Sequence, residues 1–348
     1  MIKTSHLAGA FAVLALTSSG AAYAAAGVTL NGSGSTLSKP YQEVAIEQFK
    51  KSHGDVTINY GGGGSGKGRQ DLADMVVDFA GSDSPFKEAE AAKAKGGPLL
   101  YFPILLSPIA VTYNVGVDKL QLSAPTIAKI FQRDIKKWND PAIAADNPGA
   151  KLPDTDIVVA HRAEGSGTTQ NFTEYLSTAA KDVWKLKSGS TVEWPSDTQA
   201  GQGSAGVAQI VKSTKGAIAY VDLSDAKASG LKYATIKNRA GKFIEPTAEA
   251  ASAAGEGIEV KDNLTFSAID AKGEKAYPIT AQTWVIVYAR QTDKAKADAL
   301  KAYLTFLVKD GQSLLPGIDY APLPKTLQDK AIKQVEKVKV AAHADLTR

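Results

Sequence analysis

The sequence is poor in the residues that thiol, metal and nucleic-acid chemistry require. Its 348 residues include no cysteine and only four histidines. The lack of cysteine excludes disulfides, thiol catalysis, zinc ribbons, iron–sulfur ligation and a lipid-modified N-terminal cysteine. An excess of charge of one sign is also missing, with 40 Lys and Arg against 36 Asp and Glu, and no strongly basic patch indicates a nucleic-acid binder. Neither a metal site, nor a cofactor, nor nucleic-acid binding is therefore expected.

After the first two dozen residues, no hydrophobic run is long enough to span a membrane. Lys3, the apolar stretch 7–16 and the motif Ala22-Tyr23-Ala24 predict a cleaved secretory signal over residues 1–24, with cleavage beside Ala24, Ala25 or Ala26. The alternative, a membrane anchor, is disfavoured because the apolar run is shorter than the roughly 20 residues that a spanning helix needs. With no cysteine available for lipidation, we expect a periplasmic protein that is not lipid-anchored.

What is present is ordinary globular composition and a repeated strand–turn–helix pattern. Hydrophobic residues make up 44% of the chain, and its length suggests roughly two domains. Short apolar strands followed by Gly-rich turns and helices predict an α/β fold with largely parallel sheets. The expected strands cover residues 28–30, 56–60, 76–80, 157–160 and 216–221, and a helix is expected through 72–75.

Two long extended segments, residues 100–113 and 277–290, are predicted to carry the chain between two lobes. Lobe I would then consist of residues 25–110 together with 280–348, and lobe II of residues 111–279. An amphipathic helix after Leu323 is expected to pack on lobe I. The Ala/Gly-rich segment 248–257 is expected to be the least ordered stretch, as a surface loop or a short helix.

Four turns rich in Gly, Ser and Thr are the candidate ligand-binding segments. They cover residues 31–36, 61–68, 81–85 and 164–168, and three of them directly follow a predicted strand. Such turns form the ligand crevice of open α/β sheets, and free N–H groups at a helix start favour an anion. Plain loop geometry explains any one such turn alone. Four in one chain favour an anion site.

The most specific of these turns follows Arg162. Arginine is scarce in this chain, yet Arg162 stands just before the helix-start sequence Gly165-Ser166-Gly167-Thr168. A guanidinium can bind a tetrahedral oxyanion through two parallel hydrogen bonds, and the N–H and hydroxyl groups of Ser166–Thr168 would add donors. Glu164 is close enough to orient the guanidinium. The alternative is a surface Arg–Glu pair beside a helix cap.

Asp83 ends a buried strand and has two possible roles. It could cap the next helix, or it could discriminate between anions. Phosphate near neutral pH keeps a proton that a carboxylate can accept, whereas sulfate has none and would meet an uncompensated negative charge in a dry site.

Together these motifs resemble the phosphate-binding periplasmic proteins of phosphate ABC importers, over essentially the whole predicted mature chain. The matching segments are Gly32–Thr36, Tyr60–Ser65, Val77–Asp83, Ile135–Asn139, Arg162–Thr168, Gly216–Tyr220 and Tyr320–Pro324. The resemblance implies a two-lobed, type II-like periplasmic binding protein with two hinge crossings. It also implies a dehydrated phosphate held between the closed lobes.

The resemblance further implies a role for each site residue. Thr36 and Leu37 would donate from the first turn, Ser65 from the second, and Asp83 would accept the phosphate proton. Arg162 would pair with the anion, while Ser166, Gly167 and Thr168 would surround it at a helix start. The chain departs from the family pattern at two of these positions, since Leu37 stands where Phe is frequent and Glu164 where Asp is frequent.

The expected function is therefore a periplasmic receptor that binds inorganic phosphate and delivers it to the ABC-type permease of the inner membrane. We expect a monomer without catalytic residues. Another oxyanion such as sulfate, molybdate or arsenate remains an alternative ligand, and a secreted phosphatase with the same site remains an alternative function. Two further matches are weaker. Residues 61–67 nearly match a nucleotide-binding P-loop but lack the Ser or Thr at position 68, and Ser84–Lys87 matches the S-x-x-K of serine enzymes without its companion motifs.

Overall fold

The computed structural model describes residues 27–341, so the predicted signal segment lies outside the described residues. Strands and helices alternate along most of this range, which confirms the α/β fold class. The helices are α1 (Lys39–Lys50), α2 (Ser65–Ala73), α3 (Glu88–Ala91), α4 (Ala124–Phe131), α5 (Pro141–Asp146), α6 (Gly167–Ala179), α7 (Gly203–Ser213), α8 (Leu223–Ala228), α9 (Ala248–Ala254), α10 (Lys294–Val308), α11 (Lys325–Val335) and the 3₁₀ turns η1 (Asp310–Leu314) and η2 (Pro316–Ile318). The strands are β1 (Val28–Gly34), β2 (Val56–Gly63), β3 (Phe79–Ser82), β4 (Leu99–Tyr113), β5 (Gln121–Leu122), β6 (Val158–Arg162), β7 (Gln199–Gly201), β8 (Ala217–Asp222), β9 (Lys232–Tyr233), β10 (Thr235–Lys237), β11 (Phe243–Ile244), β12 (Thr280–Tyr288), β13 (Arg290–Gln291) and β14 (Lys339–Val340).

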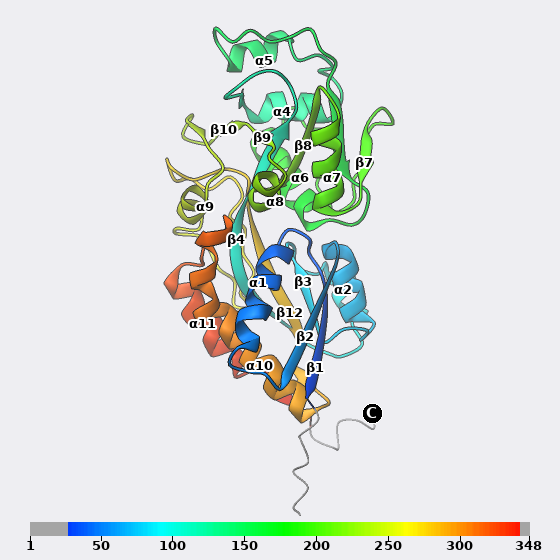
Figure 1. Ribbon diagram of the computed structural model, residues 1–348, viewed down its shortest axis with the longest axis vertical. Coiled ribbons are helices and arrows are strands. Elements are labelled where there is room, and N and C mark those ends of the chain that lie inside the picture. Colours follow the sequence, from blue (N-terminus) through cyan, green and yellow to red (C-terminus); the bar gives the residue numbers. More distant parts are fainter. Residues whose placement is uncertain (1–26, 342–348) are drawn as a thin grey trace, which may run out of the picture.

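One long strand, β4, links two groups of strands. The order along the main sheet is β2-β1-β3-β12-β4-β8-β6-β7, with β9 also paired to β4. The first part of β4, up to Pro108, pairs with β12, and the part from Ile109 to Tyr113 pairs with β8. In Figure 1, β4 accordingly runs from the lower half of the molecule into the upper half, and β12 lies beside it.

The prediction of largely parallel sheets holds only within each group. β1, β2 and β3 are parallel to one another, as are β6, β7 and β8. β12 is antiparallel to both β3 and β4, and β4 is antiparallel to β8. The physical reason is that the chain ascends along β4 and returns along β12, so these two neighbouring strands must run in opposite directions.

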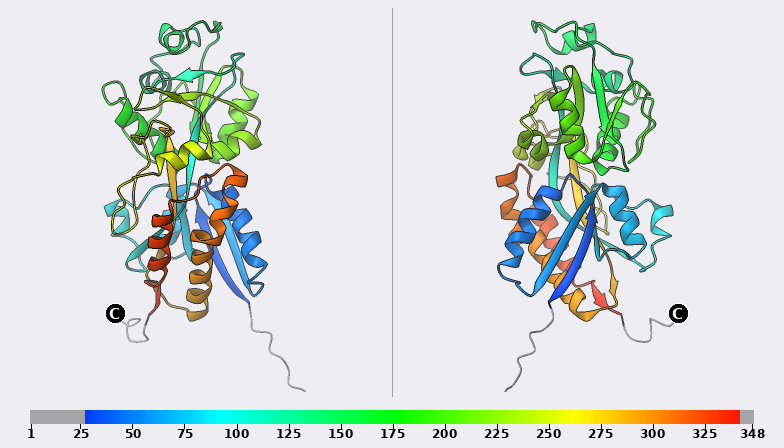
Figure 2. Two further views of the ribbon diagram at one scale, coloured as in Figure 1. Left: turned by 90° about the vertical axis from the view of Figure 1, so that its left-hand side faces the viewer. Right: turned by 45° about the vertical axis from the view of Figure 1, so that its right-hand side comes forward.

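Helices cover both groups of strands (Figures 1 and 2). The lower half contains β1–β3, β12, α1, α2, α10 and α11, and the upper half contains α4–α8, β7 and β8, with β6 paired between these two strands. Helix α10 illustrates why these helices form, because Leu300, Tyr303, Leu304 and Leu307 recur on one face and are all buried against the sheet. The predicted C-terminal helix is present as α11, which packs against α10 and β4.

Several predicted segments differ from the structure. The strands predicted over 28–30 and 56–60 extend to Gly34 and Gly63, into segments that were expected to be turns. The helix expected through Leu72 already begins at Ser65, because Gly63 and Gly64 adopt positive φ angles of 116° and 90° that end β2 and turn the chain into α2. The following strand then starts at Phe79 rather than at Val76, which is exposed.

The Ala/Gly-rich segment 248–257 forms the short helix α9, capped by the Thr247 hydroxyl, which accepts from the Ala250 N–H. It was predicted to be the least ordered stretch, yet Ala250, Ala251 and Ala254 are buried. Within residues 27–341, no helix is long and apolar enough to cross a membrane.

Candidate anion-binding site

The predicted site residues lie at the ends of strands from both halves. Thr36 and Leu37 follow β1, Ser65 follows β2 at the start of α2, and Asp83 follows β3. Because β1, β2 and β3 are parallel, these three strand ends meet at one edge of the sheet. Arg162 ends β6 in the upper half, and α6 begins five residues later. The two halves therefore present strand ends and helix starts to each other.

The start of α6 supplies the donors that the motif predicts, with one correction. The N–H groups of the first helical turn have no acceptor within the helix, and Gly167 and Thr168 hold these positions. Ser166 is the N-cap, and its Oγ accepts from the Thr169 N–H at 3.1 Å. The Ser166 N–H was also expected to donate to a ligand, but it already donates to the Ser190 carbonyl at 2.9 Å. Only the hydroxyl hydrogen of Ser166 remains available.

Arg162 is buried and held in place by its neighbours. Its side chain is 2% exposed, and its Nη2 donates to the Glu164 Oε1, as the sequence predicts. Its Nη1 lies 3.4 Å from the Thr168 Oγ1. Glu164 uses its second oxygen to accept from the Gly203 N–H, at the start of α7, at 3.3 Å. The Arg162 Nε has no hydrogen-bond partner among residues 27–341, which leaves one donor of a buried cation for a ligand.

Asp83 is the buried carboxylate of this region and is 1% exposed. Its Oδ1 accepts from the Ser35 and Thr283 hydroxyls, both at 2.6 Å, and its Oδ2 accepts from the Ser65 hydroxyl at 3.1 Å. Burial raises the pKa of Asp83, while the three hydroxyl donors and the charge of Arg162 oppose that rise. The alternative role as a helix cap is not seen, because α3 begins at Glu88 with Lys87 as its N-cap residue.

The two halves touch each other directly around these groups. The Gly66 N–H donates to the Gly165 carbonyl at 2.9 Å, and the Thr36 Oγ1 lies 3.1 Å from the Ser204 Oγ. At Gly167 the approach is so close that a Cβ would lie 2.3 Å from the Ser65 Oγ. Anion donors of the upper half therefore face Ser65 and Asp83 of the lower half.

Four polar residues around Asp83 were not predicted from the sequence. Ser35 and Thr283 donate to its carboxylate, and Asn171 on α6 donates to its backbone carbonyl at 2.7 Å. Gln282 on β12 donates to the Asn171 side chain at 2.8 Å. The sequence could have indicated Gln282 and Thr283, because polar residues within a long apolar strand need buried hydrogen-bond partners.

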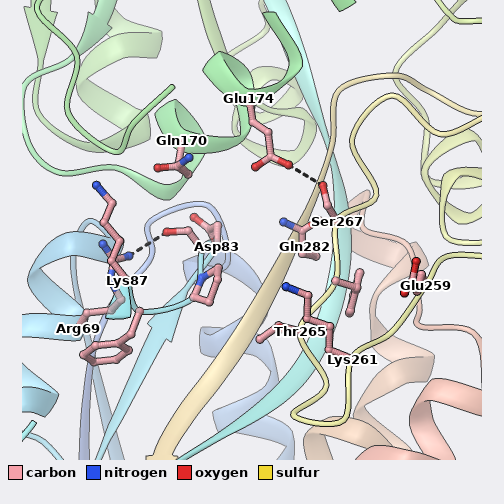
Figure 3. A pocket seen from close by; sticks show the side chains of 14 residues that line it. Arg69, Asp83, Lys87, Gln170, Glu174, Glu259, Lys261, Thr265, Ser267 and Gln282 are labelled. Carbon is pink, nitrogen blue, oxygen red and sulfur yellow. Dashed lines mark hydrogen bonds between the residues drawn. The ribbon is translucent and has the colours of Figure 1, made fainter. Parts of the chain in front are cut away.

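A cavity of about 530 Å³ lies on another side of Asp83 (Figure 3). Arg69 borders it but is already paired with Glu90 and with the Ser84 hydroxyl. Glu174 of α6 reaches across and accepts from the Ser267 hydroxyl at 2.8 Å. Gln170 of α6 borders it, but neither Arg162 nor the donor residues Ser166–Thr168 line this cavity, so it is distinct from the cluster of anion donors.

The groups behind the alternative enzyme predictions are engaged elsewhere. His161 contacts the Arg162 carbonyl and the Thr198 hydroxyl and stacks on Trp194, and burial lowers the pKa of His161. Lys67, from the near-match to a P-loop, is paired with Asp71. Within the described part of the chain, no group of three or more His, Asp or Glu side chains could hold a metal ion.

Comparison with known proteins agrees with this architecture. A family model described as a PBP superfamily domain matches residues 19–310. The phosphate-binding protein PstS of Methanocaldococcus jannaschii is 36% identical over 341 residues, covering 90% of this chain and 87% of the relative. PstS of Xylella fastidiosa (strain Temecula1) is 35% identical over 319 residues, covering 89% and 84%. The solved structure of PfluDING, a high-affinity periplasmic phosphate-binding protein, has the same fold, with a TM-score of 0.74 at 20% identity over 88% of this chain and 94% of that one.

The fold and the family model define a protein of the PBP superfamily. Within it, the chain belongs to the phosphate-binding protein PstS family. The resemblance drawn from the sequence motifs is thereby confirmed.

Proposed function

We propose that this protein binds inorganic phosphate between its two halves and delivers it to an ABC-type permease of the inner membrane. The observation that carries the proposal is the pairing of two opposite groups in one buried site. Arg162 offers a cation with a free donor, and Asp83 offers a carboxylate that can accept a proton. The relatives support the ligand, because each is named a phosphate-binding protein, and the PfluDING structure contains phosphate.

Phosphate is held mainly by oriented donors rather than by bulk charge. Backbone N–H groups of Thr36, Leu37, Ser65, Gly167 and Thr168 surround the anion, since each stands at or near the start of a helix. The hydroxyl groups of Ser166 and Thr168 add further hydrogen bonds, whereas the Ser65 hydroxyl donates to Asp83. Arg162 binds through its guanidinium while Glu164 keeps the guanidinium oriented. This arrangement needs no cofactor.

Asp83 selects phosphate over sulfate. Monobasic and dibasic phosphate carry a P–O–H group that donates a hydrogen bond to the Oδ2 of Asp83. A contact between two negative groups that would otherwise repel each other thereby becomes a hydrogen bond. Sulfate brings only acceptors, so two negative groups would meet in a site without water. The 1% exposure of Asp83 supports this mechanism, because water cannot screen the repulsion. Arsenate carries the same proton, and Asp83 does not reject it.

Binding and release require the two halves to move as lobes. We assign lobe I to residues 25–110 and 280–348, and lobe II to residues 111–279. Two observations support the crossing points, since β4 changes its partner at Ile109 and the chain returns at Thr280, where β12 begins. Within the range assigned to lobe II, Ala251, Phe266 and Ala268 pack against hydrophobic residues of lobe I. The contacts between Gly66 and Gly165 and between Thr36 and Ser204 belong to the closed form. Opening about β4 and β12 separates them and releases the anion.

The protein is a monomeric receptor of the periplasm and not an enzyme. The PstS relatives are binding proteins, and the signal predicted over residues 1–24 accounts for export. Cleavage beside Ala24–Ala26 leaves a chain without a cysteine for lipid attachment.

Titration calorimetry on phosphate-stripped protein, with phosphate and with sulfate at pH 7, tests the proposal. We expect phosphate to bind at least a hundredfold more tightly than sulfate, because a buried unpaired charge costs several kcal/mol. Absence of phosphate binding, or sulfate binding of equal strength, would overturn the proposed ligand. Small-angle scattering with and without phosphate tests closure separately, since closed lobes give a smaller radius of gyration.

A further inference from the structure

Thr283 lies 200 residues from Asp83 in the chain and uses its hydroxyl on that carboxylate. It stands in the middle of β12, one of the two strands between the halves, and is 0% exposed. Gln282 precedes it, and the residues that follow it on the strand, beginning with Trp284 and Val285, are hydrophobic. A hydroxyl in such a strand needs a partner, and the one that Thr283 has is the Oδ1 of Asp83 at 2.6 Å.

The two oxygens of Asp83 differ in their surroundings. Oδ1 accepts two short hydrogen bonds, from Ser35 and Thr283. Oδ2 accepts only from Ser65, at the longer distance of 3.1 Å, and lies 2.6 Å from the place where a Cβ on Gly167 would stand. Oδ2 therefore faces the start of α6, and Oδ1 points away from it. Two donors on Oδ1 leave no room there for a proton of the carboxyl group itself.

We propose that Thr283 is a specificity-determining residue, which keeps the Asp83 carboxylate ionised and turned so that Oδ2 alone meets the ligand. This inference rests on the proposed function. The Thr283 hydroxyl acts on Asp83, so we class Thr283 as a positioning residue. Its role follows from charge, because a hydroxyl that donates to a carboxylate stabilises the ionised form over the protonated one.

The consequence concerns which anion binds. Dibasic phosphate needs ionised Asp83, whereas sulfate binds only when Asp83 is protonated and can donate. At a pH above the pKa of Asp83, each rise of one unit in that pKa increases the protonated fraction of Asp83 tenfold. It therefore strengthens sulfate binding tenfold and does not strengthen phosphate binding. The other titratable groups around Asp83 are Arg162 on β6 and Tyr60 on β2, together with Arg69, Lys87 and Glu174, which border the same cavity as Asp83. All of them remain in the variants below.

The test is Thr283→Val, which keeps the branched shape and removes the hydroxyl. We expect the ratio of sulfate Kd to phosphate Kd at pH 7 to fall by about tenfold, since a hydrogen bond to a charged group is worth roughly one pKa unit or more. Sulfate binding should also persist to a higher pH than in the wild type. Thr283→Ser, which restores the hydroxyl, should return both properties to the wild-type values.

Thr280→Val is the matched control. Thr280 lies on the same strand, is also 0% exposed, and donates one hydrogen bond, but to the Tyr277 carbonyl instead of Asp83. Its loss should leave the anion ratio and the pH profile unchanged. Ser35→Ala, which removes the other donor to Oδ1, should shift the ratio in the same direction as Thr283→Val and keeps the test possible if that variant does not fold.

The outcomes separate this inference from the proposed function. If the wild type does not bind phosphate, the proposed function is wrong. If the wild type prefers phosphate but Thr283→Val and Ser35→Ala keep its ratio and pH profile, the function stands and the role of Thr283 is wrong. An equal change in Thr280→Val would also overturn the inference, because strand β12 as a whole would then be responsible.

Discussion

Replacing Arg162 with Ala gives the most direct measure of how dry the site is. The Arg162 side chain is 2% exposed, so water does not screen its charge, and its Nε is free to donate. Removing one partner of a buried, hydrogen-bonded charge pair costs about 2–5 kcal/mol, which corresponds to a loss of roughly 30- to 5,000-fold in phosphate affinity. The upper part of this range is expected, because Glu164 would be left unpaired beside the anion.

The assay is titration calorimetry with phosphate at pH 7 and moderate salt, together with the unfolding midpoint of each ligand-free variant. Arg133→Ala is the control, because Arg133 is a largely buried arginine of the upper half that binds Asp197 and the Ile157 carbonyl instead of the site. It should leave the affinity within about twofold of the wild type. Arg162→Lys should fall between wild type and Arg162→Ala, since a lysine keeps the charge without the planar fork.

A loss of less than about fivefold in Arg162→Ala would refute the reasoning. Such a value corresponds to roughly 1 kcal/mol, which is typical of a solvent-exposed ion pair. Arg162 would then lie outside the binding site in solution, and the anion would depend on backbone donors alone.

Two further predictions concern Asp83 and Gly167. Burial raises the pKa of Asp83. Between the ordinary carboxyl pKa of about 4 and this raised pKa, the folded protein holds a proton that the unfolded chain releases, so the free energy of unfolding falls as the pH rises through this window. In urea unfolding of ligand-free protein, Asp83→Asn should therefore gain stability relative to the wild type as the pH increases from 4, and parallel curves would contradict the raised pKa. Gly167→Ala would place a Cβ 2.3 Å from the Ser65 Oγ, so closure must shift and phosphate affinity should fall by roughly 5- to 150-fold, the effect of 1–3 kcal/mol of overpacking. The thermal midpoint of Gly167→Ala without ligand should change little. Gly116→Ala is the control, because nothing lies within 4 Å of its Cβ position. Unchanged phosphate affinity in Gly167→Ala would show that the halves do not close this tightly.

Local features of the site were predictable because neighbouring residues create them. Ser166 caps α6 and Glu164 pairs with Arg162, and both interactions join residues at most three positions apart. The start of α2 was misplaced because the glycines before Ser65 read equally well as a loop. Only the backbone angles of Gly63 and Gly64 show where the strand ends.

The ligand class was also predictable, since it depends on residue types. One arginine before a Gly-Ser-Gly-Thr helix start indicates an oxyanion ligand. A carboxylate at a nearby strand end indicates an oxyanion that carries a proton. The detailed donor list was less predictable. The Ser166 N–H is consumed by Ser190, a residue in a loop that no motif connects to the site.

By itself the sequence determined the α/β class, the approximate positions of the longer strands, and the residues proposed to form the anion site. These follow from short-range patterns of hydrophobic, glycine and capping residues. Tertiary structure alone decided that β12 runs antiparallel to β4, that Gly167 meets Ser65, and that Thr283 donates to Asp83. Such contacts join residues about 100 to 200 positions apart, and their geometry depends on how the whole chain crosses between the two halves and not on any local pattern.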